Sequence, residues 1–162
     1  MVHRSQPESE TPDVKPTSAP RDGLICERAR PDIKPAALAL LLTGQAGAGG
    51  QAVSRFLAYS DQVGLDLTDL WAARRGDTLR AATLLVPSPG RASMLFLSPL
   101  RESAARADLQ EVVKAAADAQ EPKRVRVIQS LLDPEETHAP PALAASGFEM
   151  LAELVYMQRR GT

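Results

Sequence analysis

Residues 70–98, LWAARRGDTLRAATLLVPSPGRASMLFLS, are the most informative part of the chain about its fold. They contain three extended apolar runs, which are Leu70 to Arg74, Leu79 to Val86 and Ala92 to Ser98. Two short segments rich in turn-forming residues separate them, Arg75-Gly76-Asp77 and Pro87-Ser88-Pro89-Gly90-Arg91. Strands joined by such short connections pair antiparallel. The stretch therefore predicts a three-stranded antiparallel meander.

Shorter elements precede the meander. Leu24 to Ala29 alternates in polarity and predicts a strand. Ala36 to Thr43 predicts a short helix that ends at Gly44, and Gln51 to Val63 predicts a second helix after a glycine-rich loop. The stripe expected to face the core on this second helix consists of Val53, Phe56, Leu57 and Val63.

A helix and two further strands are expected after the meander. Ala104 to Ala119 carries Leu109, Val112, Val113 and Ala116 at helical spacing. Arg124 to Leu131 alternates like a strand, Ala142 to Ser146 predicts one helical turn after a loop, and Met150 to Gln158 predicts a last strand. The aromatic residues of the expected strands are also expected in the core. They are Trp71 and Phe96 in the meander and Tyr156 in the last strand.

The first 22 residues differ from the rest of the chain. They hold Pro7, Pro12, Pro16 and Pro20 among Ser, Glu, Asp and Lys, which is too little apolar surface to offset the entropy of ordering. We expect residues 1–22 to be a disordered N-terminal tail and residues 23–162 to form one domain. Its class is α/β (α+β), with a mixed, mostly antiparallel central sheet flanked by helices.

Composition narrows the function classes. The 19 Lys and Arg nearly balance the 20 Asp and Glu, so no strong net charge would attract nucleic acid or an anionic membrane. The single cysteine, Cys26, excludes an internal disulfide and is expected in the core, and no cysteine and histidine cluster has zinc-site spacing. No apolar run is long enough to span a bilayer. We expect a cytoplasmic protein without a metal, a nucleic-acid partner or a membrane partner.

The order of the elements resembles the GNAT superfamily of acyl-CoA-dependent N-acyltransferases. The resemblance covers Leu24 to Arg159. It depends most on the strand that ends Met94-Leu95-Phe96-Leu97-Ser98-Pro99, on the helix that follows, and on Ala144-Ala145-Ser146-Gly147-Phe148 before the final strand. It implies that acetyl-CoA is the donor and an amine the acceptor. Backbone groups of Phe96, Leu97 and Ser98 would hold the pantetheine arm in a gap beside the strand.

The resemblance also places a pyrophosphate-binding loop after this strand. The family pattern is Arg or Gln, two residues, Gly, one residue, then Gly or Ala. Leu100 falls on its first position, Ser103 on the glycine and Ala105 on the last, with Arg101 and Arg106 as candidate phosphate ligands.

The loop departs from the family pattern in sterics and in charge. No glycine occurs between Gly90 and Gly147, and a β-carbon hinders the approach of backbone to phosphate, so weak or absent CoA binding is expected. Asp108 with Glu111 predicts a capping box, which would start the helix late and put a carboxylate at its anion-binding end.

The catalytic end departs from the family as well. Many members carry a tyrosine four residues before the Gly-Phe pair, where it can protonate the leaving thiolate, and that position is Leu143. An asparagine often found seven residues earlier corresponds to Glu136. Glu135, Glu136 or His138 could serve as general base by proximity, and we take Glu136 and His138 as the candidates.

Two hypotheses remain from the sequence. The first is an N-acetyltransferase of reduced activity that takes acetyl-CoA and a primary amine. The second is a pseudoenzyme, meaning a GNAT-fold domain without catalysis that serves as an interaction module or as the N-terminal half of a tandem acetyltransferase whose other half does the chemistry. Its partner would be a second GNAT domain or another copy of the chain. A small-ligand sensor is a third alternative.

Overall fold

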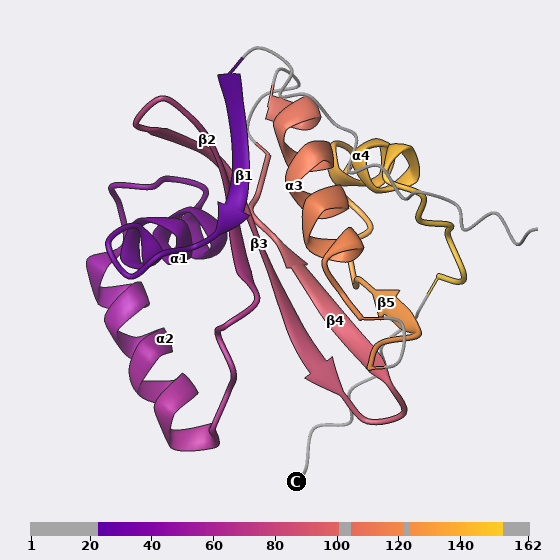
Figure 1. The fold of residues 1–162 in the computed structure, drawn as a ribbon, viewed down its shortest axis with the longest axis horizontal. Coiled ribbons are helices and arrows are strands. Elements are labelled where there is room, and N and C mark those ends of the chain that lie inside the picture. The colour runs from indigo at the N-terminus through magenta and orange to yellow at the C-terminus, as the bar shows by residue number, and fades with distance from the viewer. Residues whose placement is uncertain (1–22, 101–104, 122–123, 154–162) are drawn as a thin grey trace, which may run out of the picture.

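The computed structural model describes residues 23–100, 105–121 and 124–153. Within them, five strands form one sheet flanked by four helices (Figure 1). The elements in chain order are β1 (Leu24–Arg28), α1 (Lys34–Thr43), α2 (Gly50–Val63), β2 (Leu70–Arg75), β3 (Thr78–Ser88), β4 (Ala92–Leu97), α3 (Arg106–Asp118), β5 (Val127–Gln129) and α4 (Ala139–Ala145). The expected tail, residues 1–22, lies outside the described residues.

The sheet contains the expected meander. Strands β1 to β4 pair antiparallel in sequence order, and β5 adds to β4 in parallel. The turn between β3 and β4 is tighter than expected, because pairing extends to Ser88 opposite Ala92. Gly90 and Arg91 complete this turn with φ angles of 81° and 62°. The mixed, mostly antiparallel sheet is therefore confirmed.

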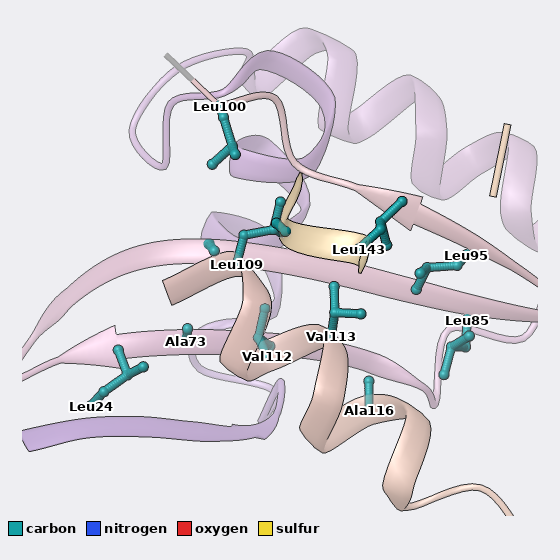
Figure 2. Packing of buried hydrophobic residues seen from close by; sticks show 12 residues of the cluster. Leu24, Ala73, Leu85, Leu95, Leu100, Leu109, Val112, Val113, Ala116 and Leu143 are labelled. Carbon is teal, nitrogen blue, oxygen red and sulfur yellow. The ribbon is translucent and has the colours of Figure 1, made fainter. Parts of the chain in front are cut away.

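Helices cover both faces of the sheet, and each face has its own core. Figure 2 shows the core beneath α3, where Leu85 and Leu95 of the sheet belong to the same cluster as Leu109 and Val113 of the helix. The core on the opposite face lies beneath α1 and α2 and includes Leu38. Residues 81–85 of β3 are all buried, since alternate side chains enter the two cores.

The beginning of α3 differs from the expectation. The capping box of Asp108 and Glu111 is wrong, because the helix begins at Arg106 and its N-cap is Ala105. Asp108 lies in the first turn, and its carboxylate forms ion pairs with Arg75 at 2.7 Å and Arg80 at 3.2 Å. The apolar stripe of this helix is fully buried as expected.

Two other helices begin earlier than the sequence pattern indicated. Helix α1 begins at Lys34 and α4 at Ala139, each with a proline in its first turn. The segment from Pro134 to Pro141, which was expected to be a loop, is therefore helical from Ala139 onward. Proline is tolerated there because the first N–H groups of a helix have no intrahelical partner.

The core-facing stripe of α2 is only partly as expected. Val53 is buried and Phe56 and Leu57 are half-buried, whereas Val63 is 52% exposed. Ser60 occupies the buried position instead, and its hydroxyl donates to the carbonyl oxygen of Leu57. The hydrogen bond allows this polar residue to be buried.

The last two expected strands differ most. Strand β5 has three residues, where Arg124 to Leu131 was expected. Residues 150–153 form no strand, and the rest of the predicted strand, with Tyr156, lies outside the described residues. An alternating sequence pattern shows that a segment can adopt the extended conformation of a strand. How many of its residues pair depends on the edge of the neighbouring strand. No helix among the described residues is long and apolar enough to cross a membrane.

Candidate functional site

The candidate site begins where β4 and β5 part. The two strands pair through Ala92, Ser93 and Met94 on β4, opposite Val127, Ile128 and Gln129 on β5. One residue further along, the Ser130 hydroxyl donates to the carbonyl oxygen of Leu95 at 2.9 Å. In a continued parallel pair of strands, a backbone N–H would donate to this oxygen instead. The described pairing ends there, so the last residues of β4 border a gap in the sheet.

Hydrogen bonding to β3 fixes which backbone groups face this gap. The Ser98 N–H donates to the carbonyl oxygen of Ala82 at 2.9 Å, and the Ala82 N–H donates to the Ser98 hydroxyl at 3.0 Å. Backbone groups of an antiparallel strand alternate in direction, so those of Leu95 and Leu97 point toward the β5 side. Leu97 therefore directs its peptide groups toward the gap.

A cleft of about 630 Å³ lies beside the gap. This volume is in the usual range for small-molecule sites. Its walls come from α1, α2, β3, β4 and the segment between β5 and α4, and they include residues from both cores. The lining residues are Leu41, Leu42, Phe56, Tyr59, Leu65, Leu84, Val86, Met94, Leu95, Phe96, Leu97, Ser98, Pro99, Ser130, Leu131, Leu132, Asp133, Glu136 and Ala139.

The structure brings together three of the residues that the sequence assigned to the cofactor. Phe96, Leu97 and Ser98 all line the cleft. The expectation that Phe96 belongs to the core is wrong, since it is 48% exposed. Trp71 is half-buried and packs against the core beneath α3.

The predicted pyrophosphate loop is only partly described. Arg101 and Ser103 lie outside the described residues, Ala105 is the N-cap of α3, and Arg106 is its first residue. The Nε atom of Arg106 is buried, and no described residue accepts a hydrogen bond from it. A buried guanidinium donor without a partner is costly.

The negative charge of Asp108 at the beginning of α3 is neutralised by ion pairs, whereas the sequence suggested that it would occupy the anion-binding end of the helix. The Asp108 side chain is only 3% exposed, and the arginines of the β2–β3 hairpin pair with it. Its charge is compensated within the protein. The carboxylate therefore opposes an anion at the helix end less than its sequence position suggests.

The two candidate bases occupy different places. Glu136 lines the cleft, and its Oε1 accepts hydrogen bonds from the N–H groups of His138 at 2.7 Å and Ala139 at 3.1 Å. This carboxylate therefore caps the beginning of α4. His138 is half-buried at the N-cap position and is not part of the cleft lining. Of the pair, only Glu136 can contact a ligand in the cleft.

Two cleft residues have chemistry that the sequence reasoning did not select. Tyr59 on α2 places a phenol in the cleft, and Asp133 places a second carboxylate there. Neither residue lies in a sequence motif. The available signal was weak: Tyr59 follows Phe56 by three positions on an expected helix, and Asp133 precedes Glu136 by three positions. Leu143, at the position where the resemblance led us to look for a tyrosine, is buried in the core beneath α3.

Cys26 is unsuited to a nucleophilic role. It is half-buried and packs against the core beneath α3, as expected. Burial, with smaller contributions from the carboxylates of Glu111 and Asp108, raises the pKa of its thiol to about 11. The reactive thiolate is therefore scarce at neutral pH. The described residues contain no group of His, Cys, Asp and Glu that could hold a metal ion.

Comparisons with known proteins identify the fold. No family model and no curated protein matches the sequence. A putative acetyltransferase from Agrobacterium tumefaciens has a TM-score of 0.58 and 17% identity, over 83% of this chain and 99% of that chain. The aminoglycoside N-acetyltransferase AAC(6')-Iy, bound to the bisubstrate analogue CoA-S-monomethyl-acetylneamine, has a TM-score of 0.60 and 14% identity, over 85% and 98%. Glucosamine-6-phosphate N-acetyltransferase from Arabidopsis thaliana has a TM-score of 0.50 and 12% identity, over 85% and 97%. At such identities the likeness is one of fold.

Proposed function

We propose that this chain, which has the fold of the GNAT superfamily of acyl-CoA-dependent N-acyltransferases, binds acetyl-CoA and transfers its acetyl group to a primary amine. One observation carries the proposal. The β4 strand parts from β5 after Met94, beside a cleft of about 630 Å³. A parted pair of strands leaves peptide groups that a ligand can use in place of the missing strand.

The backbone of β4 supports binding of the pantetheine arm. Leu97 directs its N–H and C=O toward the gap, and the amides of pantetheine can pair with such groups. Ser98 is held by its two hydrogen bonds to Ala82, so the end of β4 is fixed before a ligand arrives. A preordered edge lowers the entropic cost of binding.

The beginning of α3 supports binding of the pyrophosphate. The helix N-terminus carries a partial positive charge, and Arg106 adds a guanidinium with an unsatisfied buried donor. Pairing of Asp108 with Arg75 and Arg80 reduces the opposing charge. These features compensate in part for the absent glycines.

The chemistry of transfer needs the loss of two protons at nitrogen and the gain of one proton at sulfur. The thioester supplies an activated carbonyl, and the neutral amine forms the C–N bond as the C–S bond breaks. The ammonium must first lose one proton, the amine nitrogen loses a second, and the departing thiolate takes up one to become a thiol. Glu136 is the candidate general base in the cleft. With Leu143 at the tyrosine position, no acid stands there, so we expect slow turnover.

Isothermal titration with acetyl-CoA tests the proposal. We expect micromolar binding, weakened about tenfold or more in Arg106→Glu, because a charge-assisted hydrogen bond becomes a repulsion. Arg55→Glu is the matched control, since Arg55 is exposed on α2 and outside the cleft lining. Absence of binding heat at millimolar acetyl-CoA would refute the proposal that the chain is an acetyl-CoA-dependent enzyme.

One observation favours the second hypothesis of a non-catalytic module. The position of the acid is filled by a leucine that packs in the core, which suits a scaffold more than a catalyst. In that case acetyl-CoA would bind without acetyl transfer to any primary amine, as judged by mass spectrometry. A tandem partner, a homodimer partner and a cytoplasmic location stay predictions.

A further inference from the structure

We infer that the acceptor is a primary amine with an apolar, aromatic or alkyl body, and that the cleft rejects hydroxyl-rich and phosphorylated sugar amines. This inference rests on the proposed function and concerns the same cleft. It depends on three properties of the lining, which are its aromatic content, the sign of its charge and the state of its hydroxyl groups.

Aromatic side chains gather in the cleft. The chain has three Phe, two Tyr and one Trp, and three of these six, Phe56, Tyr59 and Phe96, line it. Tyr59 is 57% exposed and Phe96 nearly as much, and they come from different elements. Exposed apolar side chains that converge from separate elements indicate a binding surface rather than unpacked core.

The charge of the lining has one sign. Among the described residues that line it, the carboxylates are Asp133 and Glu136, and none is a lysine, arginine or histidine. Two carboxylates favour an ammonium group and disfavour a phosphate. The aromatic faces add to this preference, because a cation is attracted to the face of Tyr or Phe.

The two serine hydroxyl groups of the lining already bond to backbone groups, and the phenol of Tyr59 is the remaining hydroxyl of the described lining. The Ser98 hydroxyl accepts the Ala82 N–H, and the Ser130 hydroxyl donates to the Leu95 carbonyl oxygen. A sugar amine brings several hydroxyls that need partners, and burying them without partners is costly. An alkyl or aryl body has no such need and gains from contact with the apolar walls.

A panel of amines tests the inference on the full chain. Phenethylamine and hexylamine are compared with glucosamine, glucosamine 6-phosphate and 2-phenylethanol by ligand-observed NMR and isothermal titration. The titrations are done with and without acetyl-CoA, and mass spectrometry detects products. We expect both apolar amines to bind at least about tenfold more tightly than either sugar. 2-Phenylethanol, which has no ammonium, is expected to bind more weakly than phenethylamine.

Variants separate the apolar contribution from the charge. Tyr59→Ser with Phe96→Ser is expected to weaken phenethylamine binding about tenfold, and Val63→Ser, an exposed apolar residue of α2 outside the cleft, should leave it unchanged. Asp133→Asn with Glu136→Gln removes both charges, and the new amide oxygen at residue 136 can still accept the hydrogen bonds that cap α4. Glu135→Gln is its control. Circular dichroism confirms that each variant folds.

The outcomes distinguish this inference from the proposed function. If acetyl-CoA binds but the apolar amines bind no better than glucosamine, the inference is wrong and the proposed function stands. If apolar amines bind and acetyl-CoA does not, the proposed function fails while the cleft preference holds. Tighter binding of octanoyl-CoA than acetyl-CoA, with no amine binding, would assign the cleft to an acyl chain and overturn the inference.

Discussion

Asp108 links one helix to a distant hairpin. Its carboxylate lies in the first turn of α3 and pairs with Arg75 at the end of β2 and Arg80 near the start of β3. Both arginines remain partly exposed, so solvent screens part of the attraction. The carboxylate itself is buried, and it depends on these partners for its hydrogen bonds.

We expect Asp108→Asn to lower the free energy of unfolding by about 1–3 kcal/mol, because it removes charge-assisted hydrogen bonds at a buried site. Urea denaturation followed by circular dichroism measures the change. Asp118→Asn makes the same substitution on an exposed residue of the same helix and is expected to change stability by less than about 0.5 kcal/mol. Equal effects at the two positions would contradict a structural role for the ion pairs.

Some residues of the candidate site were predictable from the sequence and others were not. The backbone of β4 near Phe96 was predictable, because it depends on a strand whose pattern is clear. Tyr59 and Asp133 were not, since their place in the cleft depends on how α2 and the segment after β5 fold back over the sheet. Asp108 was misread because helical capping and a tertiary ion pair use the same residue type.

Among the elements, the connection between α1 and α2 has the strictest requirement. Gly49, the N-cap of α2, has a φ angle of 74°. A β-carbon built there would lie 2.6 Å from the Cγ2 atom of Thr43 at the end of α1. Thr43 is itself fixed by a hydrogen bond from its hydroxyl to the carbonyl oxygen of Ala39. The glycine therefore allows α2 to begin close to the end of α1, and both helices form part of the cleft wall.

Gly49→Ala is expected to destabilise the protein by about 1–2 kcal/mol, through backbone strain and the clash with Thr43. Gly47→Ala is the matched control, because Gly47 lies in the same loop without a positive φ and with nothing within 4 Å of the added carbon. That control should be neutral or slightly stabilising. Thermal and urea unfolding of both variants test the difference, and equal stability would refute the steric argument.

The elements themselves were mostly predictable. Helices with a continuous apolar stripe and strands joined by short turns are determined by local sequence, so β1 to β4, α2 and α3 were found within a few residues. The extent of β5 was not, because it depends on one edge of β4 that the Ser130 hydroxyl partly occupies. The prolines before Ala142 indicated a loop, although the first turn of a helix accepts them.

The whole molecule is organised around β3. Its residues 81–85 contribute to the cores on both faces, and it pairs with β2 on one side and β4 on the other. The cleft is lined by members of both cores and therefore depends on the packing of both faces. Fold class was predictable because sheet, helices and their order follow from local patterns, whereas the cleft arises only when distant segments meet.

The parting of β4 and β5 also has a consequence for the order of folding. The meander closes through short turns, whereas Leu95 and Ser130 lie 35 positions apart and meet only after the crossover through α3. Longer closures cost more entropy and slow folding. In pulsed hydrogen exchange during refolding, we expect the Leu85 amide, bonded to Asp69, to be protected before the Arg126 amide, bonded to Arg91. Simultaneous protection would contradict this order. A newly made chain would then pass through an interval in which it is already compact but has no binding site.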